Sequence, residues 1–309
     1  MNNLKILSHG TYLPKNKITN EEFNKKFDLE TNWIEQRTGI ENRYHVENEQ
    51  LDEICVNAAR IAIEKAKIDI SEIELILVAS TSTKELMPGI SFKVQKALGI
   101  KRCICFDVLA GCSGYINIFD IARKYIATGE IKTALIIGAE VNSEYLDFND
   151  LGTAILLGDG AGATILQKTE EEKMYVSVLE SDGSSGEILT CSNKEKLFMN
   201  GKSIYKYAVT RVPENIKELL EKAPVKIEDI NYIVLHQSNI KILKSIVDKL
   251  NINEAKMYTN LKEYGNTFCA SIPIALNEMV EKGLLKEKDK IILAGYGGGL
   301  NQGSILLEI

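Results

Sequence analysis

The stretch AIEKAKIDISEIELILVAS (62–80) recurs in altered form as LLEKAPVKIEDINYIVLHQ (219–237). Each copy indicates a helix end, a short acidic turn and then a buried apolar strand. A second pair of segments, EIKTALIIGAE (130–140) and EKDKIILAGYG (287–297), has the same offset of 157 residues, and so do Cys112 and Cys269. Three agreements at one offset predict two similar halves, residues 1–165 and 166–309.

The apolar runs in both halves predict the fold class. They are IELILVAS, TALIIGAE, YIVLHQ and KIILAGYG, and they alternate with amphipathic segments such as 51–66 and 210–222. Apolar runs without in–out alternation are typical of strands covered by helices on both faces. We therefore expect a layered α/β fold with a pseudo-twofold axis between its halves. Its functional site should lie where the strand ends of the two halves meet.

The composition disfavours several classes of protein. The 309 residues are 45% hydrophobic and 26% charged with five prolines, which is typical of a globular protein. The net charge of −6 argues against nucleic acid as the main partner. No apolar run is long enough to cross a membrane, and the apolar part of the N-terminus is too short for a signal peptide, so we expect a cytoplasmic protein. The six cysteines include no CxxC pair, so we expect buried, reduced thiols and no metal site.

Cys112 is the strongest candidate for a nucleophile. The segment CICFDVLAGCSGYINIF indicates a strand, a tight turn of small residues and a helix, with Cys112 at the turn between Gly111 and Gly114. This resembles the logic of a nucleophile elbow, in which a sharp turn presents the side chain. The helix N-terminus behind the sulfur favours a thiolate. The alternative is a buried structural cysteine at a strand end.

Two polar residues of the second half are candidate partners for Cys112. Of the three histidines, His9 lies in a strand-to-turn stretch, His45 lies in a charged loop, and His236 ends the apolar strand YIVL. Asn266 precedes Cys269, the counterpart of Cys112, by three residues and so approaches the same region. The alternatives are a hydrogen-bonded histidine at a strand end and an asparagine that caps a helix or turn.

Two glycine-rich segments have a choice of interpretations. Gly297–Gly299 is either a flexible turn or a place where backbone N–H groups point at an oxyanion. GDGAGA (158–163) superficially matches a nucleotide-binding fingerprint, but the strand-like ATILQ follows it instead of a helix. We therefore interpret GDGAGA as a tight turn with close backbone packing.

Taken in order, several motifs match one family. They are WIEQRTGI (33–40), FDVLAGCSGY (106–115), GDGAGA (158–163), HQSNIKI (236–242), YGNTFCASIPIAL (264–276) and YGGGLNQGS (296–304). In this set and spacing the chain resembles the β-ketoacyl-acyl-carrier-protein synthase III enzymes of the thiolase superfamily. The resemblance implies the thiolase-like duplicated αβαβα fold and a homodimer.

The resemblance also implies a reaction. Cys112 would take an acyl group from an acyl-CoA primer, with no further cofactor. His236 and Asn266 would hold the thioester carbonyl of malonyl-acyl carrier protein during loss of CO2, and the carbanion would attack the acyl-cysteine. The backbone at Cys112 and Gly298 would form an oxyanion hole.

Further positions match the substrate-binding residues of the family. The resemblance places Trp33 and Arg37 at the mouth of a CoA tunnel, with Trp33 stacked on an adenine. The alternative for this pair is a partly buried anchor beside a salt-bridging arginine. Gly201, Tyr205 and Asn239 would line the pantetheine channel, and a basic rim for the acidic carrier protein would comprise Lys202, Lys206, Lys241 and Lys244. Solvated lysines are the alternative for the rim.

The chain departs from the family pattern at several places. Leu151 replaces the arginine that faces the tryptophan, Thr31 and Asn32 replace acidic residues, and Lys241 replaces an arginine of the docking helix. Met87 replaces a phenylalanine that shortens the acyl pocket from the partner subunit, which favours a longer or branched primer. These changes favour a specialised member that serves a secondary pathway. Two other hypotheses remain, a non-decarboxylating acyltransferase of the same fold and a non-catalytic partner subunit of a synthase.

Overall fold

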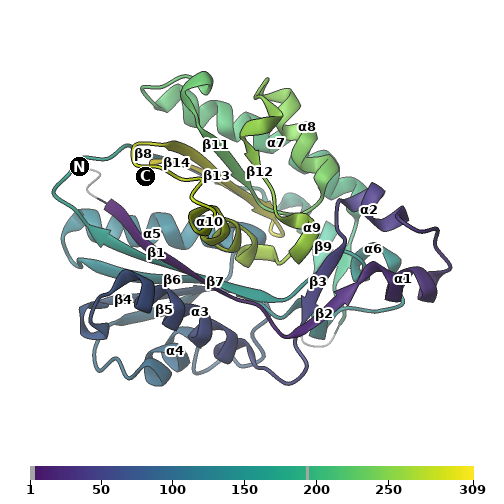
Figure 1. Cartoon of the computed structure of the whole chain (residues 1–309), viewed down its shortest axis with the longest axis horizontal. Helices are drawn as coiled ribbons and strands as arrows, with labels where there is room; N and C mark the ends of the chain where they lie inside the picture. The colour runs from purple at the N-terminus through teal and green to yellow at the C-terminus, as the bar shows by residue number, and fades with distance from the viewer. Residues whose placement is uncertain (1–3, 193–194) are drawn as a thin grey trace.

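Two five-stranded sheets with the same strand order organise the chain, in a computed structural model that describes residues 4–192 and 195–309 (Figure 1). The first sheet has the order β1 (Leu4–Tyr12), β7 (Gly160–Lys168), β6 (Thr133–Glu140), β4 (Leu75–Ala79), β5 (Ile104–Val108). The second has the order β8 (Tyr175–Ser181), β14 (Asn301–Glu308), β13 (Lys290–Gly297), β11 (Tyr232–Leu235), β12 (Met257–Tyr258).

The central strands are the apolar runs of the sequence. Every residue of β4 and β6 is buried, and so is every residue of β13 after Lys290. In each sheet three neighbouring strands are parallel, β5-β4-β6 and β12-β11-β13, and the two remaining strands pair antiparallel. The carboxyl ends of the parallel strands therefore lie at one edge of each sheet.

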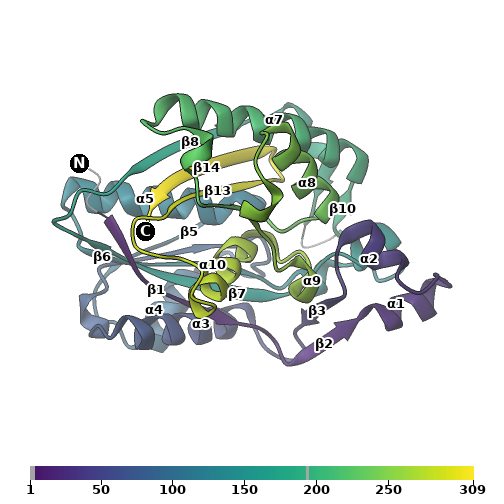
Figure 2. The ribbon, with the colours of Figure 1, turned by 45° about the horizontal axis from the view of Figure 1, so that its top comes forward.

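Helices separate and cover the two sheets (Figures 1 and 2). The central layer consists of α5 (Gly114–Thr128) and α10 (Ser271–Glu281), whose apolar side chains share one core with the inner faces of both sheets. The outer face of the first sheet packs against α3 (Leu51–Ala66) and α4 (Ile90–Leu98). The outer face of the second packs against α7 (Gly201–Lys222) and α8 (Ile240–Lys249). The prediction of a duplicated αβαβα fold is confirmed.

Smaller elements surround the strand ends. They are the hairpin β2 (Asn16–Thr19) and β3 (Asn42–His45), the hairpin β9 (Leu189–Thr190) and β10 (Phe198–Met199), and the short helices α1 (Asn20–Phe27), α2 (Trp33–Thr38), α6 (Leu151–Ala154) and α9 (Leu261–Tyr264). Single 3-10 turns precede the two central helices, η2 (Gly111–Ser113) before α5 and η7 (Phe268–Ala270) before α10, and η3 (Asn142–Tyr145) follows β6. No helix within the described residues is both long and apolar enough to span a bilayer.

Helix α7 starts earlier in the chain than the amphipathic segment 210–222 indicated. Helix α7 begins at Gly201 rather than near residue 210, because the Asn200 side chain caps it by accepting a bond from the Ser203 N–H at 3.1 Å. The division of the chain at residues 165 and 166 stays a prediction. The first sheet continues to Lys168, and the second begins at Tyr175.

Candidate active site

Cys112 lies in the turn η2 between β5 and α5, and only 4% of it is exposed. Gly111 has φ 53°, and a Cβ there would lie 2.9 Å from the Gly298 carbonyl oxygen, so this position requires glycine. Asn301 fixes the turn from the second half: its Nδ2 donates to the Ala110 carbonyl at 2.9 Å, and its Oδ1 accepts from the Ser113 hydroxyl. The sharp turn that the sequence indicated is therefore held by a distant residue.

The Cys112 thiol is not a ready thiolate in this structure. Burial raises its pKa, the charge of Glu140 raises it further, and hydrogen bonds from the backbone of Cys112 and Gly298 lower it. The backbone groups act in the direction that the sequence predicted, but burial has the larger effect on the pKa of Cys112. The same backbone groups lie next to the sulfur. An oxyanion hole would require them to donate to the carbonyl oxygen of an acyl group on that sulfur.

His236 directly follows β11 and is 2% exposed. Burial lowers its pKa to about 3, so the ring is neutral near pH 7. Its Nδ1 lies 2.8 Å from Ser271 Oγ, which also accepts a bond from the Gln237 N–H at 3.3 Å. We assign the Ser271 proton to the bond with Nδ1, which leaves the ring proton on Nε2. His236 is then a neutral donor held by the first residue of α10.

Asn266 is held by three bonds. Its backbone N–H donates to the Leu156 carbonyl at 2.9 Å, and its carbonyl accepts from Gly158 at 3.0 Å, which ties it to the first half. Its Oδ1 accepts from the Phe268 N–H at 3.0 Å. No described residue accepts a bond from Nδ2, so both of its N–H groups are available as donors.

One cavity of about 170 Å³ brings these three side chains together. Cys112 comes from the first half, whereas His236 and Asn266 come from the second, at the meeting of strand ends that the sequence predicted. Among the residues predicted to bind substrate or carrier protein, four line this cavity, namely Gly201, Tyr205, Asn239 and Lys241. The sequence interpretation did not include Leu156, Leu189, Met199, Phe268 and Tyr296, which complete its apolar wall.

A second cavity of about 350 Å³ also reaches Cys112. Gly298 lines this cavity and not the first, and the apolar part of its wall comes from Leu109, Leu189, Leu197 and Phe268. Cys191 lines it too and is exposed, so the expectation of a buried thiol is wrong at this position. Cys112 therefore stands between two spaces of different size.

Comparisons with known proteins agree across the chain. A model of the family described as 3-oxoacyl-[acyl-carrier-protein (ACP)] synthase III matches residues 106–183, and the C-terminal model of that family matches residues 220–309. The β-ketoacyl-[acyl-carrier-protein] synthase III of Clostridium acetobutylicum is 40% identical over 100% of this chain and 99% of its own. The protein of the same name from Clostridium perfringens strain SM101 is 41% identical, with both chains covered completely.

Solved structures agree as well. The 3-oxoacyl-[acyl-carrier-protein] synthase III of Aquifex aeolicus is 38% identical and has a TM-score of 0.96, covering 99% of this chain and 100% of that one. The chain belongs to the β-ketoacyl-[acyl-carrier-protein] synthase III family. As a member of the synthase III family it is an acyl-transferring condensing enzyme with the thiolase fold. No group of three or more His, Cys, Asp or Glu side chains in the described residues is placed to hold a metal ion.

Other residues that the synthase III resemblance singled out lie outside the two cavities. Trp33 and Arg37 lie on α2, where the Arg37 guanidinium stands 4.8 Å from the centre of the Trp33 ring. Leu151 packs in the same small apolar cluster as Trp33. The side chain of Asn239 donates to the Arg37 carbonyl at 3.3 Å, which links α2 to the cavity wall.

The lysines differ from one another in their surroundings. Lys202, Lys206 and Lys244 are exposed and do not line the first cavity, whereas Lys241 does. Lys244 forms an ion pair with Glu254 at 2.8 Å. A basic rim is therefore partly neutralised at Lys244.

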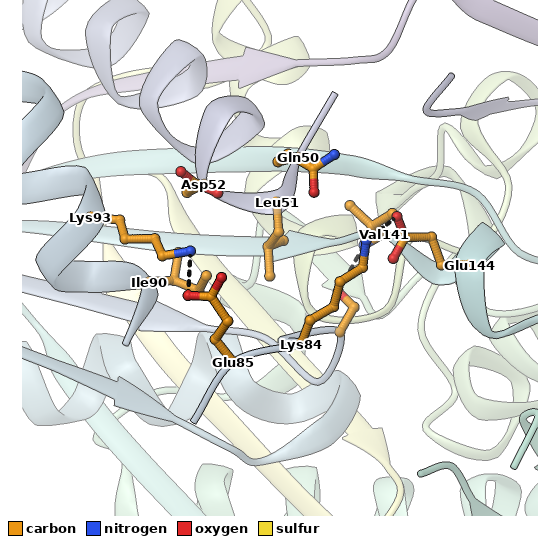
Figure 3. A pocket seen from close by; sticks show the side chains of 10 residues that line it. Gln50, Leu51, Asp52, Lys84, Glu85, Ile90, Lys93, Val141 and Glu144 are labelled. Carbon is orange, nitrogen blue, oxygen red and sulfur yellow. Dashed lines mark hydrogen bonds and ion pairs between the residues drawn. The ribbon is translucent and has the colours of Figure 1, made fainter. Parts of the chain in front are cut away.

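Met87 lies on a loop that is braced by charges. It is 87% exposed, and neither cavity at Cys112 includes it in this single chain. A small cavity of about 50 Å³ lies at the base of this loop. Beside it Lys84 pairs with Glu144 at 2.7 Å and Lys93 pairs with Glu85 at 2.8 Å (Figure 3). None of the predicted site residues lines this cavity, so we do not include it in the candidate active site.

Two local predictions concern His45 and the segment GDGAGA (158–163). His45 ends β3 and is buried, with Nε2 3.0 Å from the Leu157 carbonyl, so its placement in a charged loop was wrong. The close backbone packing of GDGAGA is confirmed, because a Cβ at Gly162 would lie 2.6 Å from Pro273 and one at Gly158 would lie 2.6 Å from the Tyr264 carbonyl. Its interpretation as a tight turn is wrong, because β7 begins at Gly160 and includes the rest of the segment.

Proposed function

We propose that this chain catalyses the decarboxylating condensation of an acyl-CoA primer with malonyl-acyl carrier protein through Cys112, His236 and Asn266. The observation that carries the proposal is their convergence on one cavity, with a thiol beside two neutral N–H donors. The names of the relatives supply the carrier-bound class of substrate.

In the first step the Cys112 sulfur attacks the carbonyl carbon of the acyl-CoA. The thioester bond of the substrate breaks, CoA leaves as its thiol with the proton of Cys112, and an acyl-cysteine remains. The tetrahedral intermediate carries its negative charge on oxygen. The backbone N–H groups of Cys112 and Gly298 lie next to the sulfur and stabilise that charge.

In the second step malonyl-acyl carrier protein loses CO2. The electron pair of the broken carbon–carbon bond moves into an enolate, whose oxygen accepts bonds from His236 Nε2 and Asn266 Nδ2. The enolate carbon attacks the acyl carbonyl, the bond to Cys112 breaks, and the Cys112 thiolate that leaves takes a proton from solvent. A neutral His236 suits this role, since a donor is needed and no proton has to be removed.

The first cavity suits the pantetheine arm that both substrates share. Gly201, Tyr205, Asn239 and Lys241 line its outer part, and α7 and α8 expose Lys202, Lys206 and Lys244 nearby in sequence. We assign the carrier-protein rim to these lysines. We assign the CoA contact to the Trp33–Arg37 pair. Leu151 does not line the first cavity and packs in the same apolar cluster as Trp33.

The second, larger cavity suits the primer chain, because its wall is largely apolar and it reaches Cys112. A flexible Met87 delivered by a partner subunit would limit its depth less than a phenylalanine does. Housekeeping use of acetyl-CoA is therefore less favoured than a longer or branched primer in a specialised pathway.

Association as a homodimer is part of the proposal. Strand β5 is an edge strand, and Ile104 and Leu109 at its ends are 39% and 75% exposed. The Met87 loop lies against β5, since a Cβ at Gly89 would stand 2.5 Å from Asp107, and it exposes 92% of Leu86. An unpaired edge beside exposed apolar side chains fits a second copy of this chain. We place the enzyme in the cytoplasm.

Intact-mass measurement after exposure to a panel of acyl-CoAs tests the proposal. We expect one acyl group on the wild-type chain and on Cys191→Ala, and none on Cys112→Ala. Adding malonyl-acyl carrier protein labelled in its free carboxyl group should then release labelled CO2. Acylation without CO2 release would favour a non-decarboxylating acyltransferase, and no acylation by any primer would favour a non-catalytic subunit.

A further inference from the structure

Glu140 is a buried carboxylate that the reaction above does not use. It ends β6 and is 0% exposed. It accepts bonds from the Thr81 N–H at 3.1 Å, the Ser82 hydroxyl at 2.8 Å and the Cys269 thiol at 3.2 Å. No lysine or arginine of the described residues bonds to it. A buried acceptor with several donors and no cation calls for an explanation beyond packing.

The internal duplication shows what place Glu140 occupies. The offset of 157 residues that relates Cys112 to Cys269 also relates Glu140 to Gly297. A Cβ at Gly297 would lie 2.8 Å from the Cys112 sulfur, so glycine leaves room for the nucleophile. At the equivalent place beside Cys269 a glutamate is present instead. The Cys269 sulfur lies 3.2 Å from Glu140 Oε1 and 3.1 Å from the Ala79 carbonyl oxygen, and we assign its single proton to the carboxylate, which is the stronger acceptor. The counterpart of the catalytic centre is thus a structural contact.

Cys269 ends the turn 266–269, which contains Asn266 and contacts His236. Phe268 has φ 46°, a left-handed conformation that a phenylalanine rarely adopts without support. Its N–H donates to Asn266 Oδ1, and its backbone also bonds to the His236 ring. Because Cys269 is the next residue, its bond to Glu140 restrains the turn that orients both Asn266 and His236.

On its other side Glu140 restrains the turn after β4. Thr81 lines the second cavity beside Cys112. Ser82 lines the small cavity of Figure 3, and its hydroxyl accepts from the Val141 N–H at 2.8 Å. One carboxylate therefore connects two turns, 80–82 and 266–269, which reach the space around Cys112 from opposite halves.

We propose that Glu140 is a positioning residue of the condensing site, which holds the turns 80–82 and 266–269 in one arrangement around Cys112. The inference rests on the proposed function only where condensation is measured.

The charge of Glu140 provides an independent readout. It raises the pKa of Cys112, and it also contributes to raising those of Cys269, Cys55, Cys191 and Tyr145. Glu140→Gln removes that charge and sets an N–H₂ donor against groups that donate. The variant should therefore make Cys112 a better nucleophile toward a small reagent and the site a poorer condensing catalyst.

Two measurements on the full-length enzyme test this. The first is the rate of alkylation of Cys112 by iodoacetamide at a fixed pH of about 8, resolved by peptide mass spectrometry. The second is the kcat and KM of condensation. For Glu140→Gln we expect faster alkylation, because a larger fraction of Cys112 is thiolate, with kcat reduced roughly tenfold or more and KM within about twofold. Glu130→Gln, an exposed control, should match the wild type in both.

An unchanged alkylation rate, or a kcat within about twofold of wild type, would overturn the proposal. A second pair of variants keeps it testable if Glu140→Gln does not fold. Cys269→Ser retains a donor to Glu140 and should keep most of the activity, whereas Cys269→Ala should lose roughly tenfold in kcat. Equal kcat values for the two would also contradict it. If the wild type condenses no primer, the proposed function fails, while the change in alkylation rate still decides the role of Glu140.

Discussion

At the scale of single residues, the support of His236 determines what the ring can do. Ser271 accepts one bond from Gln237 and lies 2.8 Å from Nδ1, so its only proton is directed at the ring. Without that hydroxyl, the neutral ring would be free to carry its proton on Nδ1, and Nε2 could not donate to an enolate oxygen.

We expect Ser271→Ala to lower the kcat of condensation by roughly tenfold or more, because the tautomer of His236 is no longer fixed. Acylation of Cys112 by acyl-CoA should stay within about twofold of wild type, since that step does not use His236. Steady-state condensation rates and intact-mass acylation time courses measure the two effects. An equal loss in both steps would mean that Ser271 supports the whole site and not the histidine.

The space beside Cys112 gives a steric prediction. A Cβ at Gly297 would lie 2.8 Å from the Cys112 sulfur and 2.8 Å from its Cβ, so Gly297→Ala must displace the nucleophile. We expect acylation to fall by roughly a hundredfold. Gly183→Ala is the matched control, because nothing lies within 4 Å of a Cβ there. Similar acylation rates for the two alanine variants, measured by intact mass, would show that the site tolerates the displacement.

The sequence allowed the reactive side chains to be found, but not the residues that hold them. Cys112, His236 and Asn266 stand out because each follows a strand or turn with unusual neighbours. Asn301, Ser271 and Glu140 do not, since their partners are far away in the chain: Asn301 bonds to Ala110, 191 residues before it. The burial that raises the pKa of Cys112 could not be predicted for the same reason, because it depends on the complete fold.

At the scale of elements, α8 illustrates how one residue can serve structure and site together. Its N-cap is Asn239, whose Oδ1 accepts from the Lys241 N–H at 2.9 Å and whose Nδ2 donates to Arg37 on α2 at 3.3 Å. The sequence indicated a substrate contact here. Because Asn239 also forms these hydrogen bonds, its effect on stability must be measured separately from any effect on substrate binding.

We expect Asn239→Ala to lower the free energy of unfolding by about 1 kcal/mol, because the first turn of α8 loses its cap. Urea denaturation followed by circular dichroism measures this. Asn239→Asp is the matched control, since a carboxylate caps the helix but cannot donate to Arg37. A value for alanine equal to wild type would leave substrate contact as the sole role of this residue.

At the scale of the whole molecule, two buried histidines make stability depend on pH. Burial lowers the pKa of His236 to about 3, and burial together with the charge of Lys65 lowers that of His9 to about 3. Between the ordinary pKa of 6.5 and that value, the unfolded chain binds protons that the folded chain does not. Stability therefore falls as the pH falls through this range.

The expected slope is about 1.4 kcal/mol per pH unit for each histidine. His9→Gln should lose about 2 kcal/mol less stability than wild type between pH 7 and pH 5, as measured by urea denaturation at both pH values. Between pH 7 and pH 8 the two proteins should change in parallel. An equal loss on acidification would assign the acid sensitivity to other groups.

The overall architecture was largely predictable, because a repeated pattern of long apolar runs permits few arrangements. The order of the strands was not, since it depends on which runs pair across the sheet. Nor was the start of α7, which is determined by the Asn200 cap and not by periodicity.

The central layer has a consequence for biosynthesis. Ile116 and Phe119 of α5 contact residues that the ribosome adds later: a Cβ at Gly295 would lie 3.1 Å from Ile116, and the Phe119 ring stacks on Tyr175. While the first half is being synthesised, this face of α5 lacks its packing partners from the second half. Its apolar side chains are then exposed to solvent. Nascent molecules should therefore be clients of chaperones until the second half arrives. Cys112 is synthesised before His236 and Asn266, so the condensing site is complete only after the second half has folded.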